Sequence, residues 1–170
     1  MLLTQIAKYL GANVIGTVST PEKAEQASRA GADHVINYTT SDVLSGVKAL
    51  TSNEGVNVAY DGVGKDTFDT SLASLRRLGW MVSFGNASGV VPPFSLLRLS
   101  EKNVTLVRPT LFNYIATREE FNKYCEEFFA LLVAQKVDIK IHKTYKLSDV
   151  KQAHSDLEGR KTSGKLVLEP

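Results

Sequence analysis

Short, β-branched apolar runs alternate with amphipathic stretches along the chain, at a spacing of roughly 20 to 25 residues that is typical of βα units. The runs predict strands at 13–18, 34–37, 56–60, 81–84 and 104–107. They are nearly continuously apolar, as strands are when helices cover both faces of a parallel sheet. The sequence therefore predicts an α/β fold with a doubly wound, mostly parallel, Rossmann-like sheet.

Helix signals occupy the stretches between these runs. Thr20, Pro21 and Glu22 supply a capping hydroxyl, a proline suited to the first helical position and an acid at the positive helix end. This helix is expected to end at Gly31. Further helices are predicted from 40–42 through Leu50, over 65–78 with a buried stripe of Phe68, Leu72, Leu75 and Leu78, and over 117–135 with a capping box at its start.

Both ends of the chain carry their own patterns. Residues 2–10 make a helical face that Gly11 can close, and the tail predicts a strand at 140–145, a helix at 148–158 and a strand at 165–168. In a doubly wound domain a strand and a glycine-rich loop come before the first helix. We therefore expect that first strand and that loop to be absent from this chain.

Charge and cysteine content narrow the possible partners and compartment. The 20 Lys and Arg against 18 Asp and Glu leave a net charge of +2, so nucleic acid is not the default partner. The single cysteine, Cys125, cannot form an internal disulfide, which favours a reducing, cytoplasmic compartment. The longest apolar runs fall far below the ~20 residues that span a bilayer, so no membrane association is expected.

Ligands of a doubly wound sheet bind beyond the carboxyl ends of its strands. An NAD-specific site usually has an acid after the second strand of the fold. With the first strand absent, the 13–18 run takes that second place, and Ser19 and Lys23 follow it instead of an acid. A cation there favours a 2′-phosphate, and Tyr38 could add a phenolic donor, so NADPH is the predicted cofactor. The alternative is that Lys23 is a solvated lysine in a first helical turn.

Two glycine pairs follow later strands. Gly62 and Gly64 bring backbone close to a possible ligand, although a turn that needs positive φ explains them equally well. Gly85 and Asn86 leave the same choice, with the Asn86 amide as a candidate partner for a nicotinamide carboxamide or a ribose.

Metal and nucleophile chemistry find little support. His34, His142 and His154 are far apart in sequence, and one cysteine cannot build a Cys-rich zinc site. Cys125 lies in the long predicted helix among phenylalanines, where a buried thiol is the simpler interpretation. No Gly-x-Ser-x-Gly elbow suggests a hydrolase.

Several stretches together resemble the zinc-free quinone oxidoreductases, the zeta-crystallin-like branch of the medium-chain dehydrogenase/reductase superfamily. The stretches that carry the resemblance lie at 16–23 (GTVSTPEK), 35–38 (VINY), 60–64 (YDGVG), 82–86 (VSFGN), 108–111 (RPTL) and 164–168 (GKLVL). The resemblance covers essentially the whole chain.

This resemblance implies NADPH-dependent reduction of quinones or related electrophilic carbonyl compounds, by hydride transfer without a metal. It implies a 2′-phosphate site, contacts along the adenosine and ribose, contacts to the nicotinamide half, and one further nucleotide contact. The 2′-phosphate contacts are Ser19, Lys23 and Tyr38, and Val63 with Gly62 lies along the adenosine and ribose. The contacts to the nicotinamide half are Phe84, Gly85, Asn86 and Phe112, and Arg160 is the further nucleotide contact.

Full-length members of that family begin with a GroES-like catalytic domain, which we expect to be absent here. Residues 1–170 are then an incomplete cofactor-binding domain, in which 140–170 form the carboxyl-terminal return. Little or no activity is expected of this chain alone, and the resemblance implies a homodimer. The alternatives are a non-catalytic dimerisation or AU-rich RNA-binding module, and an enoyl or alkenal reductase of the same superfamily.

Overall fold

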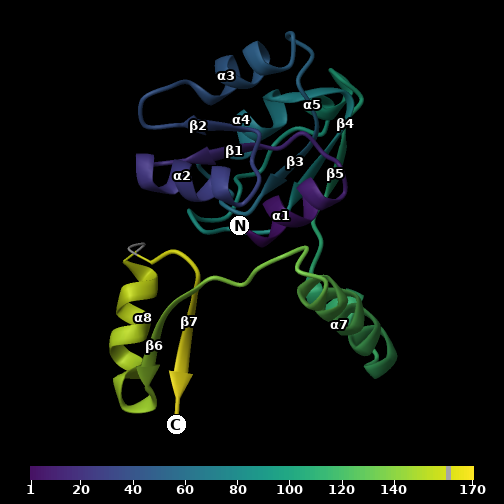
Figure 1. Ribbon diagram of the computed structural model, residues 1–170. Coiled ribbons are helices and arrows are strands. Elements are labelled where there is room, and N and C mark those ends of the chain that lie inside the picture. The colour runs from purple at the N-terminus through teal and green to yellow at the C-terminus, as the bar shows by residue number, and fades with distance from the viewer. Residues whose placement is uncertain (160–161) are drawn as a thin grey trace.

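The computed structural model describes residues 1–159 and 162–170 (Figure 1). Helices and strands alternate along most of the chain, as the spacing of the apolar runs predicts. In chain order the elements are α1 (Leu2–Tyr9), β1 (Ile15–Val18), α2 (Pro21–Arg29), β2 (His34–Asn37), α3 (Val43–Leu50), β3 (Val56–Asp61), α4 (Phe68–Ala73), β4 (Leu75–Ser83), α5 (Leu97–Ser100), β5 (Thr105–Val107), α6 (Leu111–Tyr114), α7 (Arg118–Val133), β6 (Ile141–Lys146), the 3₁₀ helix η1 (Leu147–Asp149), α8 (Val150–Glu158) and β7 (Lys165–Glu169).

Strand pairing is parallel wherever the described strands meet, which confirms the predicted fold class. β1 pairs with β2, β3 with β4, and β4 with β5. Within the described residues β1 and β3 do not pair, so each has one edge free of ladder hydrogen bonds. A doubly wound sheet of order 3-2-1-4-5-6 has its first strand at this position.

The predicted starts of α2 and α3 are present with side-chain caps. The Thr20 hydroxyl accepts a hydrogen bond from the Lys23 amide at 3.3 Å, and Pro21 occupies the first turn of α2. Asp42 caps α3 through the Ser45 amide at 2.8 Å. Each cap satisfies an amide that the helix itself leaves without a partner. The local sequence therefore fixes where these helices begin.

The predicted helix over 65–78 is wrong in its length. The α4 helix runs only from Phe68 to Ala73, and β4 begins at Leu75, six residues before the strand predicted at 81–84. Leu78 has a φ of 61°, and its amide donates to the Lys102 carbonyl at 2.8 Å instead of to a helical carbonyl. Leu78 is therefore 51% exposed and lies outside the predicted buried stripe, whereas Phe68, Leu72 and Leu75 are buried.

A compact apolar cluster joins α4 to the β3–β4–β5 sheet. Its buried members are Phe68, Leu72, Leu75, Met81 and Val104. Phe68 also stacks at a tilt on the Phe94 ring, with centroids 4.9 Å apart. These residues come from α4, from β4 and from the position before β5, so the cluster holds α4 against this sheet.

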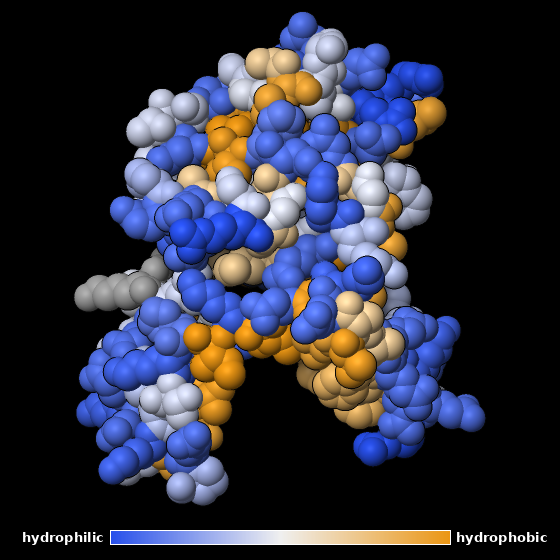
Figure 2. Space-filling model, in the orientation of Figure 1, coloured by the Kyte–Doolittle hydropathy of each residue, from blue (hydrophilic) through white to orange (hydrophobic). Residues whose placement is uncertain are grey.

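The last third of the chain projects from this body in two arms. One arm is α7, and the other is the parallel β6–β7 pair with α8 beside it (Figure 1). Figure 2 shows apolar surface along the inner sides of both arms and on the underside of the body between them. No helix in the described part of the chain is both long enough and apolar enough to cross a membrane.

Candidate functional site

The carboxyl ends of β1 and β2 bring the first group of predicted site residues together. Lys23 stands in the first turn of α2, half-buried, and its ammonium Nζ lies 3.4 Å from the Ser19 hydroxyl. Tyr38 is beside this pair because its amide donates to the Val18 carbonyl at 2.9 Å, and it is 54% exposed. The arrangement offers one cation and two hydroxyls to a ligand.

Thr39 braces this group, although the sequence reasoning did not single it out. Its hydroxyl lies 2.7 Å from the Asn37 side-chain oxygen and 3.3 Å from the Ser19 carbonyl. The turn after β1 is thereby tied to the end of β2. The signal in the sequence was the Asn37 to Thr39 spacing, which is typical of a side-chain-stabilised turn.

The end of β3 holds a buried acid, Asp61, which is 3% exposed. Its Oδ1 accepts the Val63 and Gly64 amides, both at 2.9 Å. The Thr67 hydroxyl lies 2.9 Å from Oδ1 and 2.8 Å from Oδ2, and the Ser71 hydroxyl donates to Oδ2 at 2.8 Å. Burial raises the pKa of Asp61, but these hydrogen bonds outweigh it and leave the pKa below its ordinary value.

The turn after β3 interlocks with the turn after β4. The Ala87 and Ser88 amides donate to the Gly62 and Val63 carbonyls at 3.3 and 2.8 Å, and the Lys65 amide donates to the Gly89 carbonyl at 3.1 Å. Both turns therefore form one hydrogen-bonded unit at the edge where a parallel sheet binds its ligands.

This hydrogen bonding favours one of the two interpretations of Gly62 and Gly64. Gly64 has a φ of 89°, and the amides of Val63 and Gly64 point inward to Asp61, away from any phosphate outside. The turn is therefore a glycine-requiring turn and not a phosphate cradle. Gly62 and Val63 stay predicted cofactor contacts.

The remaining predicted contacts lie around this unit. Phe84 is 48% exposed, and a Cβ atom added to Gly62 would meet its ring at 2.9 Å. Asn86 is exposed, and Phe112 in α6 is 78% exposed. Arg108 ties this side of the sheet together because its Nη1 donates to the Ser83 carbonyl at 2.8 Å. Arg160 lies outside the described residues.

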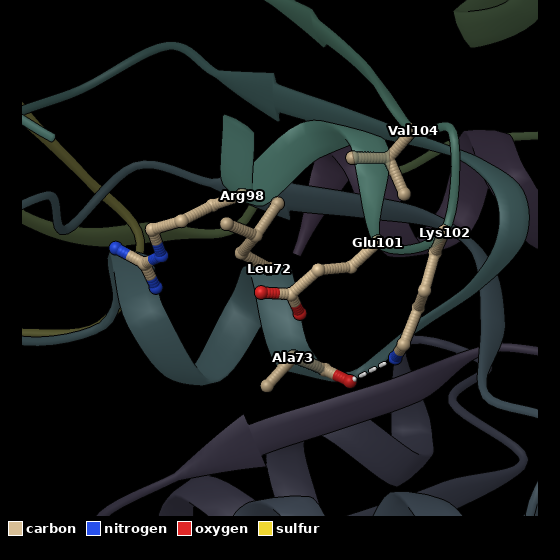
Figure 3. A pocket seen from close by; sticks show the side chains of 6 residues that line it. All are labelled: Leu72, Ala73, Arg98, Glu101, Lys102 and Val104. Carbon is tan, nitrogen blue, oxygen red and sulfur yellow. Dashed lines mark hydrogen bonds between the residues drawn. The ribbon is translucent and has the colours of Figure 1, made fainter. Parts of the chain in front are cut away.

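A small hollow elsewhere on the body does not belong to this site. Figure 3 shows its lining of Leu72, Ala73, Arg98, Glu101, Lys102 and Val104, around a volume of about 80 Å³. Lys102 donates to the carbonyls of Ala73 and Leu75, both at 2.7 Å, which satisfies the end of α4. Arg98 pairs with Asp69 at 2.8 Å. Both cations thus have structural partners.

Metal-ligating side chains do not gather in the part of the chain that the structure describes: it contains no group of three or more His, Cys, Asp or Glu able to hold an ion. His142 and His154 are exposed, and His34 is half-buried in β2. Cys125 is half-buried in α7, less enclosed than the predicted buried thiol.

Comparison with known proteins gives consistent results along the sequence. A protein-family model described as zinc-binding dehydrogenase matches residues 1–130. Quinone oxidoreductase 1 of Escherichia coli is 44% identical over 173 residues, which cover 100% of this chain and 53% of that protein. The 2-haloacrylate reductase of Burkholderia sp is 40% identical, over 96% of this chain and 50% of its own length. The chain spans about half the length of the curated relatives it matches.

Solved structures give the same result in three dimensions. The Escherichia coli quinone oxidoreductase complexed with NADPH superposes with a TM-score of 0.93 at 42% identity, over 99% of this chain and 53% of that chain. A Pseudomonas syringae quinone oxidoreductase gives a TM-score of 0.94 at 42% identity, over 99% and 52%. The fold of these relatives therefore includes both arms as well as the body.

Proposed function

Because the chain belongs to the zinc-binding dehydrogenase family, we propose that it supplies the nucleotide-binding part of an NADPH-dependent quinone reductase. Several of the similar proteins are named quinone oxidoreductases, and two solved relatives are complexed with NADPH. Their likeness extends over the whole chain, arms included.

The single observation that carries the cofactor choice is the Lys23 ammonium at the end of β1, 3.4 Å from the Ser19 hydroxyl. An acid at this position would bind the two ribose hydroxyls of NADH and repel a 2′-phosphate. A half-buried ammonium does the reverse, since it attracts the phosphate and loses little of that attraction to solvent. Tyr38, in register beside the pair, adds a phenolic hydroxyl.

The other residues orient the dinucleotide and exclude water. Gly62 and Val63 offer close-packed backbone and an aliphatic surface to a ribose, and Asn86 offers an amide to a carboxamide group. Phe84 and Phe112 are exposed aromatic side chains that can shield a reacting ring from solvent. When bound, the nicotinamide supplies the hydride, and the protein provides its binding and orientation.

The reaction we propose is hydride transfer to a quinone. A second candidate is reduction of an activated carbon–carbon double bond, which one observation favours: a 2-haloacrylate reductase is 40% identical to this chain. The chain covers only about half of either relative, so turnover by these 170 residues alone is expected to be low.

The test compares NADPH with NADH by titration calorimetry on the full chain. Lys23→Ala is expected to weaken NADPH binding about tenfold or more, because it removes a charge-assisted contact worth ~1.5–3 kcal/mol, and to leave NADH binding unchanged. Lys48→Ala, which removes an exposed lysine of α3, is the matched control. A wild-type chain that binds both nucleotides equally well contradicts the proposal.

A further inference from the structure

Asp61 is a buried acid, and no ion pair in the described part of the chain reaches it. It is the one carboxylate among the buried polar side chains of the described residues. Its donors are the Val63 and Gly64 amides and the Thr67 and Ser71 hydroxyls, all of them neutral. A buried charge without such donors would cost several kcal/mol of folding free energy. The surrounding amides and hydroxyls therefore serve to stabilise this carboxylate.

The direction of these donors decides what the turn presents to the outside. Both amides that a glycine-rich turn could offer to a phosphate are turned inward, toward Asp61. The outer surface consists instead of the Gly62 backbone, the Val63 side chain, 40% exposed, and the Phe84 ring. Such a surface suits the neutral parts of a dinucleotide, its sugar and base rings, and not its phosphates.

We propose that Asp61 is a positioning residue that acts as an internal anion: it holds the 61–64 turn, and through it the 84–89 turn, as a rigid floor for the neutral part of the cofactor. The inference rests on the proposed function, which supplies the dinucleotide. It goes further by assigning the shape of the floor to one side chain that never touches the ligand.

Hydrogen bonds between the 61–64 turn and the 84–89 turn let Asp61 hold the second turn through the first. The carbonyls of Gly62 and Val63 receive the Ala87 and Ser88 amides, and the Ser88 hydroxyl donates to the Val63 carbonyl at 2.9 Å. The Asp66 amide in turn donates to the Ser88 hydroxyl at 3.0 Å. If the 61–64 turn loses its hydrogen bonds to Asp61, the Gly62 and Val63 carbonyls that accept the amides of the second turn move with it.

The experiment uses Asp61→Ala and Asp61→Asn in the full chain, with Glu54→Ala as a control that removes an exposed acid outside both turns. Amide hydrogen exchange is measured by NMR at a temperature where every variant is folded. Equilibrium binding of NADPH and of NADH is measured on the same samples.

Asp61→Ala is expected to speed exchange at Val63, Gly64, Ala87 and Ser88 about tenfold or more, because their acceptors are lost or displaced. Asp61→Ala is expected to weaken the binding of NADPH and of NADH by the same factor, about tenfold. The ratio of the two affinities then stays unchanged, whereas Lys23→Ala changes that ratio. Asp61→Asn keeps one acceptor oxygen for both amides and should restore most of the affinity. A merely structural role would lower the unfolding temperature without this equal loss and its rescue.

Two results would overturn the inference: unchanged exchange at Val63 and Gly64 in Asp61→Ala, or wild-type affinity for both nucleotides in that variant. The second result leaves the proposed function standing. If the wild-type chain binds neither nucleotide, the proposed function fails instead, and the exchange rates still decide whether Asp61 holds the two turns.

Discussion

At the scale of single residues, Gly85 has the closest neighbour for an added Cβ atom among the glycines compared. A Cβ atom there would lie 2.2 Å from the Gly62 carbonyl oxygen, so the two turns can touch only because Gly85 has no side chain. We expect Gly85→Ala to lower the free energy of unfolding by about 2 to 3 kcal/mol, the upper range for overpacking, because backbone must move.

Gly16→Ala is the matched control for this change. A Cβ atom at Gly16 would lie 3.7 and 3.8 Å from the Ala27 and Ala32 methyl groups, which is ordinary contact. Its effect on the free energy of unfolding should stay below about 0.5 kcal/mol. Urea titration of both variants measures the difference, and equal destabilisation would contradict the close contact between the turns.

Asp61 also predicts a pH dependence of stability. Burial raises its pKa, but the Gly64 amide, the Ser71 and Thr67 hydroxyls and the Val63 amide together lower it below its value in the unfolded chain. The carboxylate therefore contributes stability above the unfolded pKa of about 4, and this contribution is lost as the pH falls through the folded pKa. The stability difference between wild type and Asp61→Asn should be constant from about pH 7 to 5 and shrink below about pH 4.

Denaturant unfolding at a series of pH values measures this difference. Asp66→Asn, which neutralises an exposed acid five residues further along, is the control and should show much less change. A difference between wild type and Asp61→Asn that stays constant, or grows, toward low pH would be inconsistent with a lowered pKa.

Much of the candidate site was predictable residue by residue. Ser19, Lys23 and Tyr38 follow their strands in sequence, and parallel strands bring their carboxyl ends to one edge, so their proximity follows from topology. The role of Asp61 was not predictable. Its donors come from positions two to ten residues later, and whether amides turn inward or outward depends on backbone angles that the glycine spacing leaves open.

At the scale of elements, α7 depends on its start. Thr117 accepts the Glu120 amide at 3.2 Å, and the Glu120 carboxylate accepts the Thr117 amide at 2.9 Å, which completes the predicted capping box. The helix has no buried residue, so local interactions carry much of its stability. Thr117→Ala should cost about 1 kcal/mol and reduce the helicity of α7 at its first turn.

Circular dichroism, together with amide exchange over 118–122, measures that loss. Glu119→Ala is the control: Glu119 is an exposed acid in the same turn that takes no part in the capping box. A Thr117→Ala chain with unchanged exchange at the start of α7 would show that tertiary contacts, not the cap, hold this helix.

The starts of α2, α3 and α7 were predictable because caps are local, but neither end of α4 was. Leu72, Leu75 and Leu78 have helical spacing, yet β4 bulges against β3 between Leu75 and Trp80, and Leu78 turns to positive φ to meet the Lys102 carbonyl. A pairing with a partner more than 20 residues away overrides the local pattern. Short apolar runs are ambiguous between helix and strand for this reason.

At the scale of the whole molecule, the body and the two arms differ in how they are held. The body has a buried cluster around Leu75 and Met81, whereas α7 carries the exposed side chains of Phe129 and Val133, 58% and 85% exposed. The fold class and the parallel topology were predictable from the spacing of the apolar runs. The projection of the arms was not, because no local pattern sets how far a helix stands from its neighbours. The homodimer stays a prediction.

The parallel topology also governs how this chain reaches its fold. None of the paired strands described above is joined to its partner by a hairpin. In the pairs β1–β2, β3–β4 and β4–β5, the crossover segment between the two strands must close before their first ladder hydrogen bond forms. Closing a crossover costs chain entropy before the strand contacts form, so we expect folding to be slow. The free edges of β1 and β3 are then open to other chains during folding. Refolding yield from denaturant should therefore fall as protein concentration rises, since intermolecular strand addition competes with crossover closure.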